Sequence, residues 1–273
     1  MARGKLEQHE IFLSGLRVRV QSCCARTNRY LQRHWSAAKL PMLPTEASCD
    51  IEVIADASPR ILVDGEVVWE GGVAEDLVAG FEHWLYRVAL AKHRGQFGVF
   101  HAAALVSDAA TVVFSGPSGA GKSSLALAAV RRGWKYFSDE FVVTDGQRVW
   151  GWPRAIRFDP TEPGTPCPNY LVGLDTDQDA VESEEDLAPP YYAVGGDALQ
   201  RVACPAREVR FVSVERGTDT TLSYVPTSVG LKYWTEAAFF EPPMSLGALV
   251  GVGRTWRASW RNPEELIDLI ATT

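Results

Sequence analysis

One stretch of eight residues carries the clearest chemical signal in the chain. It fits the pattern G-x-x-x-x-G-K-[ST] at every specified position. In such a loop the glycines let successive backbone N–H groups point inward, and a helix beginning at Lys122 adds the positive end of its dipole. The residues expected to contact a polyphosphate are Gly116, Pro117, Ser118, Gly119, Ala120, Gly121, Lys122, Ser123 and Ser124.

Two side chains in this loop have separate tasks. Lys122 is expected to reach the β- and γ-phosphates of a nucleotide, and the Ser123 hydroxyl to complete the shell of a Mg²⁺ ion. The alternative is a glycine turn that merely precedes an ordinary helix. The flanking residues favour the phosphate site, because a buried strand is predicted at 110–115 and a helix at 124–132 that ends at Gly133.

An acidic pair, Asp139 and Glu140, interrupts the next predicted strand, residues 134–143. The pair follows Lys122 closely, and the chain has neither the N-K-x-D of switch GTPases nor the L-S-G-G of ABC-type ATPases. A carboxylate beside a γ-phosphate can accept the proton of an attacking hydroxyl, which is the one proton transfer that phosphoryl transfer needs. The alternative is a solvated strand end without a chemical role.

These motifs resemble a known family. The run of residues 101–105, the glycine-rich loop, the sequence Arg132-Gly133-Trp134 and the strand with the acidic pair are similar to the catalytic core of HPr kinase/phosphorylase. The resemblance is closer to the shorter HPr-kinase-related proteins, which include kinases that tailor lasso peptides. It is specific over about residues 97–150 and weaker over 152–157 and 207–234.

The resemblance implies roles for individual residues. ATP and Mg²⁺ would be the cofactors, with Lys122 and Ser123 as the phosphate and metal ligands. Asp139 would be the catalytic base, Glu140 would help to hold the metal, and His101 would lie near the transferred phosphate. The alternative for His101 is a hydrogen-bonded structural histidine. A homo-oligomer is also an expectation from the family.

The chain departs from the bifunctional enzymes in two places. Ser124 stands where they carry Glu, and the glycine-rich residues 247–254 lack their pattern of arginine followed by alternating glycines. Phosphorylase activity and HPr as the substrate are therefore not implied. The function expected is an ATP-dependent kinase that phosphorylates a serine hydroxyl of a peptide or small protein, with a lasso-type precursor peptide as the sharper form. The alternatives are an ATP-binding sensor without transfer, and a kinase for free serine or another small hydroxyl compound.

The helices and strands expected around these residues indicate an α/β fold. A P-loop core with a mixed sheet and flanking helices is expected, preceded by a small β-rich N-terminal region. In that region the pattern indicates a strand at 51–54, a hairpin of 60–63 with 66–69, and an amphipathic helix at 74–94. The predicted division is a region of residues 1–95 and a P-loop kinase domain of residues 96–273.

Composition excludes several classes. The net charge is −7 and no apolar run is long enough for a membrane helix, so we expect no nucleic acid partner, no membrane partner and a cytoplasmic location. Five cysteines without a C-x-x-C pair indicate free thiols.

Two charged stretches have no role in the site described so far. Residues 1–40 contain eight basic and two acidic residues, and residues 175–186 contain acidic but no basic ones. These two stretches are candidates for contacts with an acceptor or partner. A mobile surface loop is the simpler interpretation of 175–186, and reception of a basic peptide is the alternative. Arg154 and Arg157 are expected to form salt bridges at the surface, with phosphate contact as their alternative.

Overall fold

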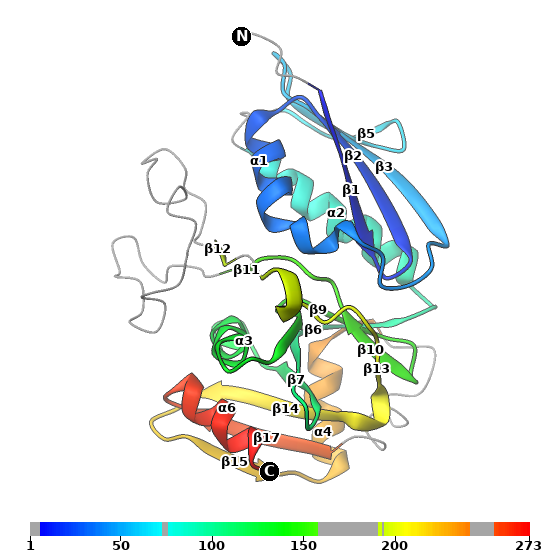
Figure 1. The fold of residues 1–273 in the computed structure, drawn as a ribbon. Helices are drawn as coiled ribbons and strands as arrows, with labels where there is room; N and C mark the ends of the chain where they lie inside the picture. Colours follow the sequence, from blue (N-terminus) through cyan, green and yellow to red (C-terminus); the bar gives the residue numbers. More distant parts are fainter. Residues whose placement is uncertain (1–5, 73–75, 158–190, 193, 241–253) are drawn as a thin grey trace.

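The computed structural model describes residues 6–72, 76–157, 191–192, 194–240 and 254–273 (Figure 1). The acidic stretch 175–186 lies outside these residues, so the hypothesis that it receives a basic peptide stays a prediction. Within the described ranges, no helix combines the length and the apolar character that crossing a membrane requires.

The N-terminal region contains a five-stranded sheet with the order β1-β2-β3-β4-β5. The strands β2 and β3 are parallel and the other neighbours are antiparallel. Along β1, β2 and β3 buried residues alternate with more exposed ones, so one face of the sheet is covered. The bounds are β1 (Glu7–Leu13), β2 (Leu16–Ser22), β3 (Ala47–Ile54), β4 (Arg60–Val63) and β5 (Glu66–Glu70).

Two tight turns set the registers of this sheet. Ser14 and Gly15 between β1 and β2, and Asp64 and Gly65 between β4 and β5, all have positive φ angles. This backbone is that of the two-residue turns whose twist matches antiparallel strands. The hairpin predicted at Asp64-Gly65 is confirmed. The first hairpin was missed, although Leu16–Ser22 alternates in the same way after its Ser-Gly turn.

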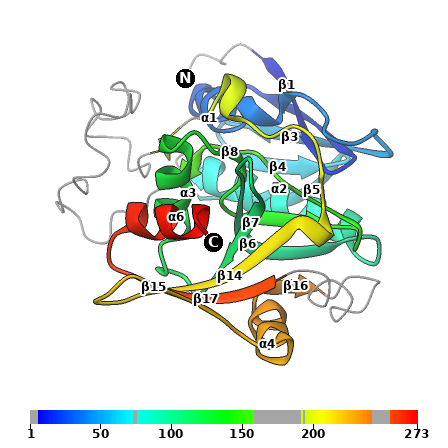
Figure 2. The ribbon, with the colours of Figure 1, turned by 60° about the horizontal axis from the view of Figure 1, so that its bottom comes forward.

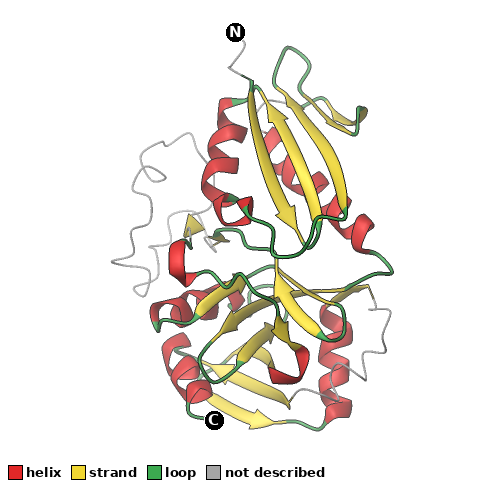
Figure 3. Ribbon diagram, turned by 45° about the vertical axis from the view of Figure 1, so that its right-hand side comes forward, coloured by secondary structure: helices red, strands yellow, loops and turns green. Residues whose placement is uncertain are grey.

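Two helices, α1 (Ala25–His34) and α2 (Leu77–His93), cover one face of this sheet (Figures 1 and 3). The predicted helix at 74–94 is confirmed as α2, which buries Phe81, Leu85 and Ala89. Helix α1 was not predicted. The N-terminal region therefore contains one α-helix more than its sequence indicated.

The second sheet has ten strands, in the order β13-β10-β9-β6-β7-β14-β17-β15, with β8 and β16 also paired to β6. The pairs β7-β14 and β14-β17 are parallel and the other pairs are antiparallel, so the sheet is mixed. The bounds are β6 (Gly98–Val106), β7 (Thr111–Ser115), β8 (Lys135–Ser138), β9 (Phe141–Thr144), β10 (Arg148–Gly151), β13 (Cys204–Pro205), β14 (Val209–Arg216), β15 (Thr221–Tyr224), β16 (Ala238–Phe240) and β17 (Arg254–Trp260). A separate short pair joins β11 (Ile156–Arg157) to β12 (Tyr191–Tyr192).

Helices cover both faces of this sheet. The helices α3 (Lys122–Arg131) and α6 (Pro263–Ala271) pack together on one side, and α4 (Thr227–Ala237) lies on the other (Figure 2). Neighbouring residues of β7 separate accordingly: Val112 and Phe114 belong to the core under α3, whereas Val113 belongs to the core shared with α4 and the N-terminal region. The structure thus has the predicted architecture, a mixed α/β P-loop core preceded by a small sheet-containing region.

The two regions are packed against each other. The indole N–H groups of Trp150 and Trp152 both point to the Ser14 hydroxyl oxygen, at 2.5 and 2.8 Å. The rings of Tyr86 on α2 and Phe141 on β9 lie 4.7 Å apart. One apolar core continues across the junction. The division at residue 95 remains a prediction about folding units, but the two sides share buried contacts.

Candidate functional site

The glycine-rich loop connects β7 to α3. Gly121 has φ +85° and is the N-cap of α3, and Gly119 has φ +79°, so both occupy the left-handed region that favours glycine. At Gly116 a Cβ atom would lie 2.5 Å from the carbonyl oxygen of Val214 on β14. The three glycines therefore meet steric demands of the loop, and they leave its backbone close to any bound phosphate.

An unpredicted residue, Trp260, supports the loop from behind. It is the last residue of β17, and its indole Nε1 donates to the Ala120 carbonyl oxygen at 3.0 Å. A Cβ atom on Gly121 would overlap the Trp260 ring. Trp260 is 3% exposed, so the loop packs against a buried indole ring. The 140 positions between the two partners explain why local patterns did not reveal this contact.

Lys122 lies across the loop. Its Nζ donates to the carbonyl oxygens of Gly116 at 2.9 Å and Pro117 at 3.4 Å. The side chain is largely buried, and this burial lowers the pKa of Lys122. Its ammonium group is thus held at the mouth of the loop by acceptors that a phosphate oxygen would replace.

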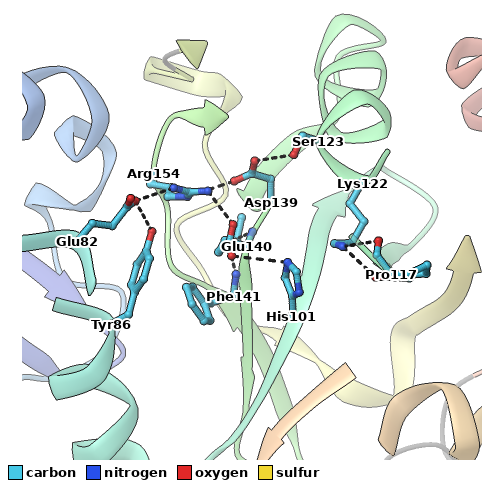
Figure 4. A network of polar contacts seen from close by, with 12 residues as sticks. Glu82, Tyr86, His101, Pro117, Lys122, Ser123, Asp139, Glu140, Phe141 and Arg154 are labelled. Atoms are coloured by element: carbon cyan, nitrogen blue, oxygen red, sulfur yellow. Dashed lines mark hydrogen bonds and ion pairs between the residues drawn. The ribbon is translucent and has the colours of Figure 1, made fainter. Parts of the chain in front are cut away.

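Ser123 and Asp139 meet at the start of α3. The Ser123 hydroxyl donates to Asp139 Oδ2 at 3.0 Å, and Asp139 is only 2% exposed (Figure 4). The other carboxylate oxygen, Oδ1, lies 3.0 Å from the Tyr136 hydroxyl. The same Tyr136 hydroxyl is 3.0 Å from the Arg154 carbonyl oxygen, so its single proton serves one of two acceptors.

Glu140 lies beside His101. The distance between Glu140 Oε1 and His101 Nε2 is 3.6 Å. Burial, with the positive charge of Lys122, lowers the pKa of His101 to about 4, so the imidazole is neutral at physiological pH. Burial raises the pKa of Glu140, and Arg154 opposes that shift. His101 is therefore a neutral imidazole, and the neighbouring Glu140 carboxylate binds a proton more readily than a carboxylate in water does.

Arg154 binds both members of the acidic pair. Its Nη2 donates to Glu140 Oε2 at 2.8 Å, and its Nε lies 3.6 Å from Asp139 Oδ1. Its Nη1 donates to Glu82 Oε1 on α2 at 2.9 Å. The predicted salt bridging of Arg154 is confirmed, but its predicted surface position is wrong, because its side chain is 3% exposed. The side chain of Arg157 lies outside the description.

A cavity of about 460 Å³ opens next to the loop. It lies between the first residues of the loop, the end of β14, and α4. His101 lines this cavity, whereas Glu140, Ser123 and Asp139 do not; Glu140 reaches its edge only through its contact with His101. The lining comprises His101, residues 115–118, residues 213–215, Tyr233, Glu236, Ala237 and Arg257.

The residues present fit a Mg²⁺ ion. Two cations, Arg154 and Lys122, face three carboxylates, Glu82, Asp139 and Glu140, so negative charge is in excess. Within the described part of the chain, no group of three His, Cys, Asp or Glu side chains could hold a metal alone. Mg²⁺ commonly uses one or two protein ligands and completes its shell with phosphate oxygens and water. Ser123 and Asp139 supply such a partial set.

The structure brings most of the predicted site residues together. The loop residues 116–123, His101, Asp139 and Glu140 converge around the loop and the adjoining cavity. Ser124 lies in the first turn of α3 and is 6% exposed. Glu82 and Trp260 are additions that no local motif indicated, and Arg154, expected at the surface, joins the acidic pair. The fold and the site together define a P-loop α/β protein in which an acidic pair adjoins the glycine-rich loop.

Comparisons with known proteins add a distant neighbour. No protein-family model matches the chain, and no curated protein matches it. Among solved structures, it is similar to the Hpr(Ser) kinase/phosphatase from Coxiella burnetii, with 16% identity, 64% of this chain and 94% of the other covered, and a TM-score of 0.30. The assignment of the site rests on the geometry of this chain and not on that likeness.

Proposed function

We propose that this protein is an ATP-dependent phosphotransferase that transfers the γ-phosphate to a serine hydroxyl of a peptide or small protein. One observation carries the proposal: Asp139 bonds to the loop serine, and Glu140 lies 3.6 Å from His101, which lines the adjoining cavity. A site that only senses ATP requires the contact between Asp139 and Ser123, but it does not require a carboxylate beside the cavity residue His101.

The contacts support a division of labour between the two acids. The loop amides and Lys122 bind and orient the phosphates, and Ser123 with Asp139 would hold Mg²⁺. When bound there, Mg²⁺ would neutralise part of the phosphate charge. Glu140, which contacts the cavity residue His101, would accept the proton of the incoming hydroxyl.

This division differs from the one that the family resemblance implies. There Asp139 is the base and Glu140 helps to hold the metal. The distances favour the exchange, because the Ser123 hydroxyl bonds to Asp139, while Glu140 is the acid that contacts a cavity residue. The original assignment remains the competing hypothesis, and metal dependence separates the two.

The size of the cavity is compatible with an acceptor that inserts a single hydroxyl-bearing group. Its volume of about 460 Å³ suits one side chain with its adjoining backbone, or a small molecule. A peptide would leave the rest of its chain outside, and a lasso-type precursor peptide is the sharper form of this proposal. Free serine or another small hydroxyl compound is the second candidate, because the same volume would enclose it whole.

The test is direct observation of transfer. The protein is incubated with ATP and Mg²⁺ together with a library of serine-containing peptides or, in parallel, free serine, and the products are analysed by mass spectrometry. A mass increase of one phosphate on a peptide, absent with Lys122→Ala, supports the proposal. Labelling of free serine alone would move the assignment to the second candidate. Tight ATP binding without any labelled acceptor would favour the sensor.

A further inference from the structure

We propose that Arg154 is a positioning residue for the acidic pair and that Glu82 of helix α2 sets its orientation, so that the N-terminal region supplies part of the catalytic site. The inference rests on the proposed function for its kinetic consequences. Its geometric content does not depend on that function.

Arg154 connects residues that are far apart in the sequence. It lies between β10 and β11, and its guanidinium reaches Glu82 with Nη1 and Glu140 with Nη2, at 2.9 and 2.8 Å (Figure 4). Its Nε faces Asp139 at 3.6 Å and is buried without a hydrogen-bond partner. Each nitrogen of one planar group therefore faces a different carboxylate, and the relative positions of the three acids depend on one another.

Glu82 is itself held in place from two helices. Its Oε1 accepts hydrogen bonds from Tyr30 on α1 at 2.8 Å and from Tyr86 on α2 at 2.7 Å, in addition to Arg154. Burial raises the pKa of Tyr86 well above its usual value, so this hydroxyl remains a donor. Glu82 is thus a fixed anchor for the guanidinium.

The backbone next to Arg154 is tied to the same region. The Ala155 N–H donates to the His34 carbonyl oxygen, at the end of α1, at 2.8 Å. The contacts of Arg154 with α1 and α2 therefore include both its backbone segment and its side chain. A change in the packing of these helices would be transmitted to Asp139 and Glu140.

The guanidinium shape is needed for this arrangement. Arg154 presents separate N–H groups in fixed directions, whereas a lysine ammonium is a single point charge on a flexible stem. Asp139 and Glu140 are adjacent in sequence and carry like charges, with Asp139 buried and Glu140 partly buried, so a cation between them offsets their repulsion. Arg154 is placed to hold Asp139 beside Ser123 and Glu140 beside His101 at the same time.

The experiment compares two changes in the network with one outside it. Glu82→Gln removes the negative charge that anchors Arg154. Arg154→Lys keeps the positive charge but loses the separate N–H groups of the guanidinium. Asp50→Asn is the matched control, because it removes a carboxylate that pairs bidentately with Arg19 at 2.6 and 2.7 Å in the same N-terminal region, away from the acidic pair. For each variant we measure phosphoryl transfer, ATP affinity, the Mg²⁺ concentration that half-saturates ATP binding, and the unfolding midpoint.

We expect Glu82→Gln and Arg154→Lys to lower kcat about tenfold or more and to raise the half-saturating Mg²⁺ concentration several-fold. ATP affinity at saturating Mg²⁺ should change less than about twofold, and Asp50→Asn should leave kcat and Mg²⁺ dependence unchanged. In Arg154→Ala, added guanidinium ion should restore transfer saturably, and ammonium at equal concentration should not. A residue with only a structural role would lower the unfolding midpoint without these effects.

Two results would overturn the inference. One is a kcat and a Mg²⁺ dependence that stay within about twofold of wild type in both network variants. The other is a crystal structure of Glu82→Gln in which Asp139 still bonds to Ser123 and Glu140 still lies beside His101. If the wild-type protein transfers no phosphate, the proposed function fails, and the Mg²⁺ dependence and the crystal structure still decide this inference.

Discussion

Ser123 and Asp139 lie in hydrogen-bond contact, with the serine Oγ 3.0 Å from Asp139 Oδ2, where helix α3 begins beside the gap between β8 and β9. Glu140, the next residue, turns instead toward His101 at 3.6 Å. Two adjacent acids therefore serve two different neighbours, one on the phosphate loop and one at the cavity.

The first prediction concerns this division. Asp139→Asn should raise the half-saturating Mg²⁺ concentration at least about tenfold, because a neutral amide is a weaker ligand for a hard cation. Glu140→Gln should lower kcat about a hundredfold with unchanged Mg²⁺ dependence, because removing a base costs about 10²–10⁴-fold. Metal titrations of ATP binding and of transfer check both effects. The reverse pattern would restore Asp139 as the base and Glu140 as the metal ligand.

The second prediction concerns the support under the phosphate loop. Gly121→Ala should abolish measurable ATP binding, because the added methyl overlaps the Trp260 ring at a position whose φ is +85°. Gly133→Ala is the matched control, since Gly133 has the same φ and open space around it. It should destabilise the fold by about 1 kcal/mol through backbone strain and leave ATP affinity unchanged. Calorimetric titration and urea unfolding provide the readouts. Equal ATP affinity in both variants would contradict the steric argument.

The third prediction concerns acid sensitivity. Burial, together with nearby Arg154, lowers the pKa of His34 to about 3, against an unfolded value of about 6.5. Between these values the unfolded chain binds the proton first, so His34 lowers stability as the pH falls below about 6.5. Wild type should lose more free energy of unfolding than His34→Gln between pH 7 and pH 5, by up to about 2 kcal/mol. Urea unfolding at the two pH values measures the difference. Parallel losses in the two proteins would show that His34 is not desolvated.

The fourth prediction concerns the cavity beside the loop. Tyr233→Ala, on the wall formed by α4, should raise the KM for the acceptor about fivefold or more and leave the KM for ATP unchanged. Lys232→Ala is the control on the same helix, because the Lys232 side chain is 74% exposed and does not line the cavity. Steady-state kinetics with each substrate varied separates the two constants. A rise in the KM for ATP instead would place the nucleotide, not the acceptor, against α4.

Local sequence information was sufficient where the chain forms its contacts locally. The loop, helix α3 and the strands β8 and β9 follow one another within a short span, so the motif and the hydrophobic pattern predicted the loop, the helix and a strand interrupted by the acidic pair. The hairpin at Asp64-Gly65 was predictable for the same reason. What these patterns could not provide is the partner of a side chain across the fold.

The missed features are long-range ones. Glu82 and Arg154 are 72 positions apart, and Ala120 and Trp260 are 140 apart. Arg154 reads as an ordinary surface cation because burial of a charge depends on tertiary packing and leaves no local signature. The first hairpin is different, because Leu16–Ser22 does alternate and its signal was present in the sequence.

The ion pair between Glu82 and Arg154 constrains how this protein can change over evolutionary time. Losing Arg154 alone would leave Glu82, Asp139 and Glu140 without their shared cation, and losing Glu82 alone would leave the guanidinium without the anchor that orients it. A substitution at either position should therefore be accepted only together with a change that restores the missing contact. For the same reason, this phosphate-loop core cannot be grafted behind an unrelated N-terminal region unless the new region brings its own anion to meet the guanidinium.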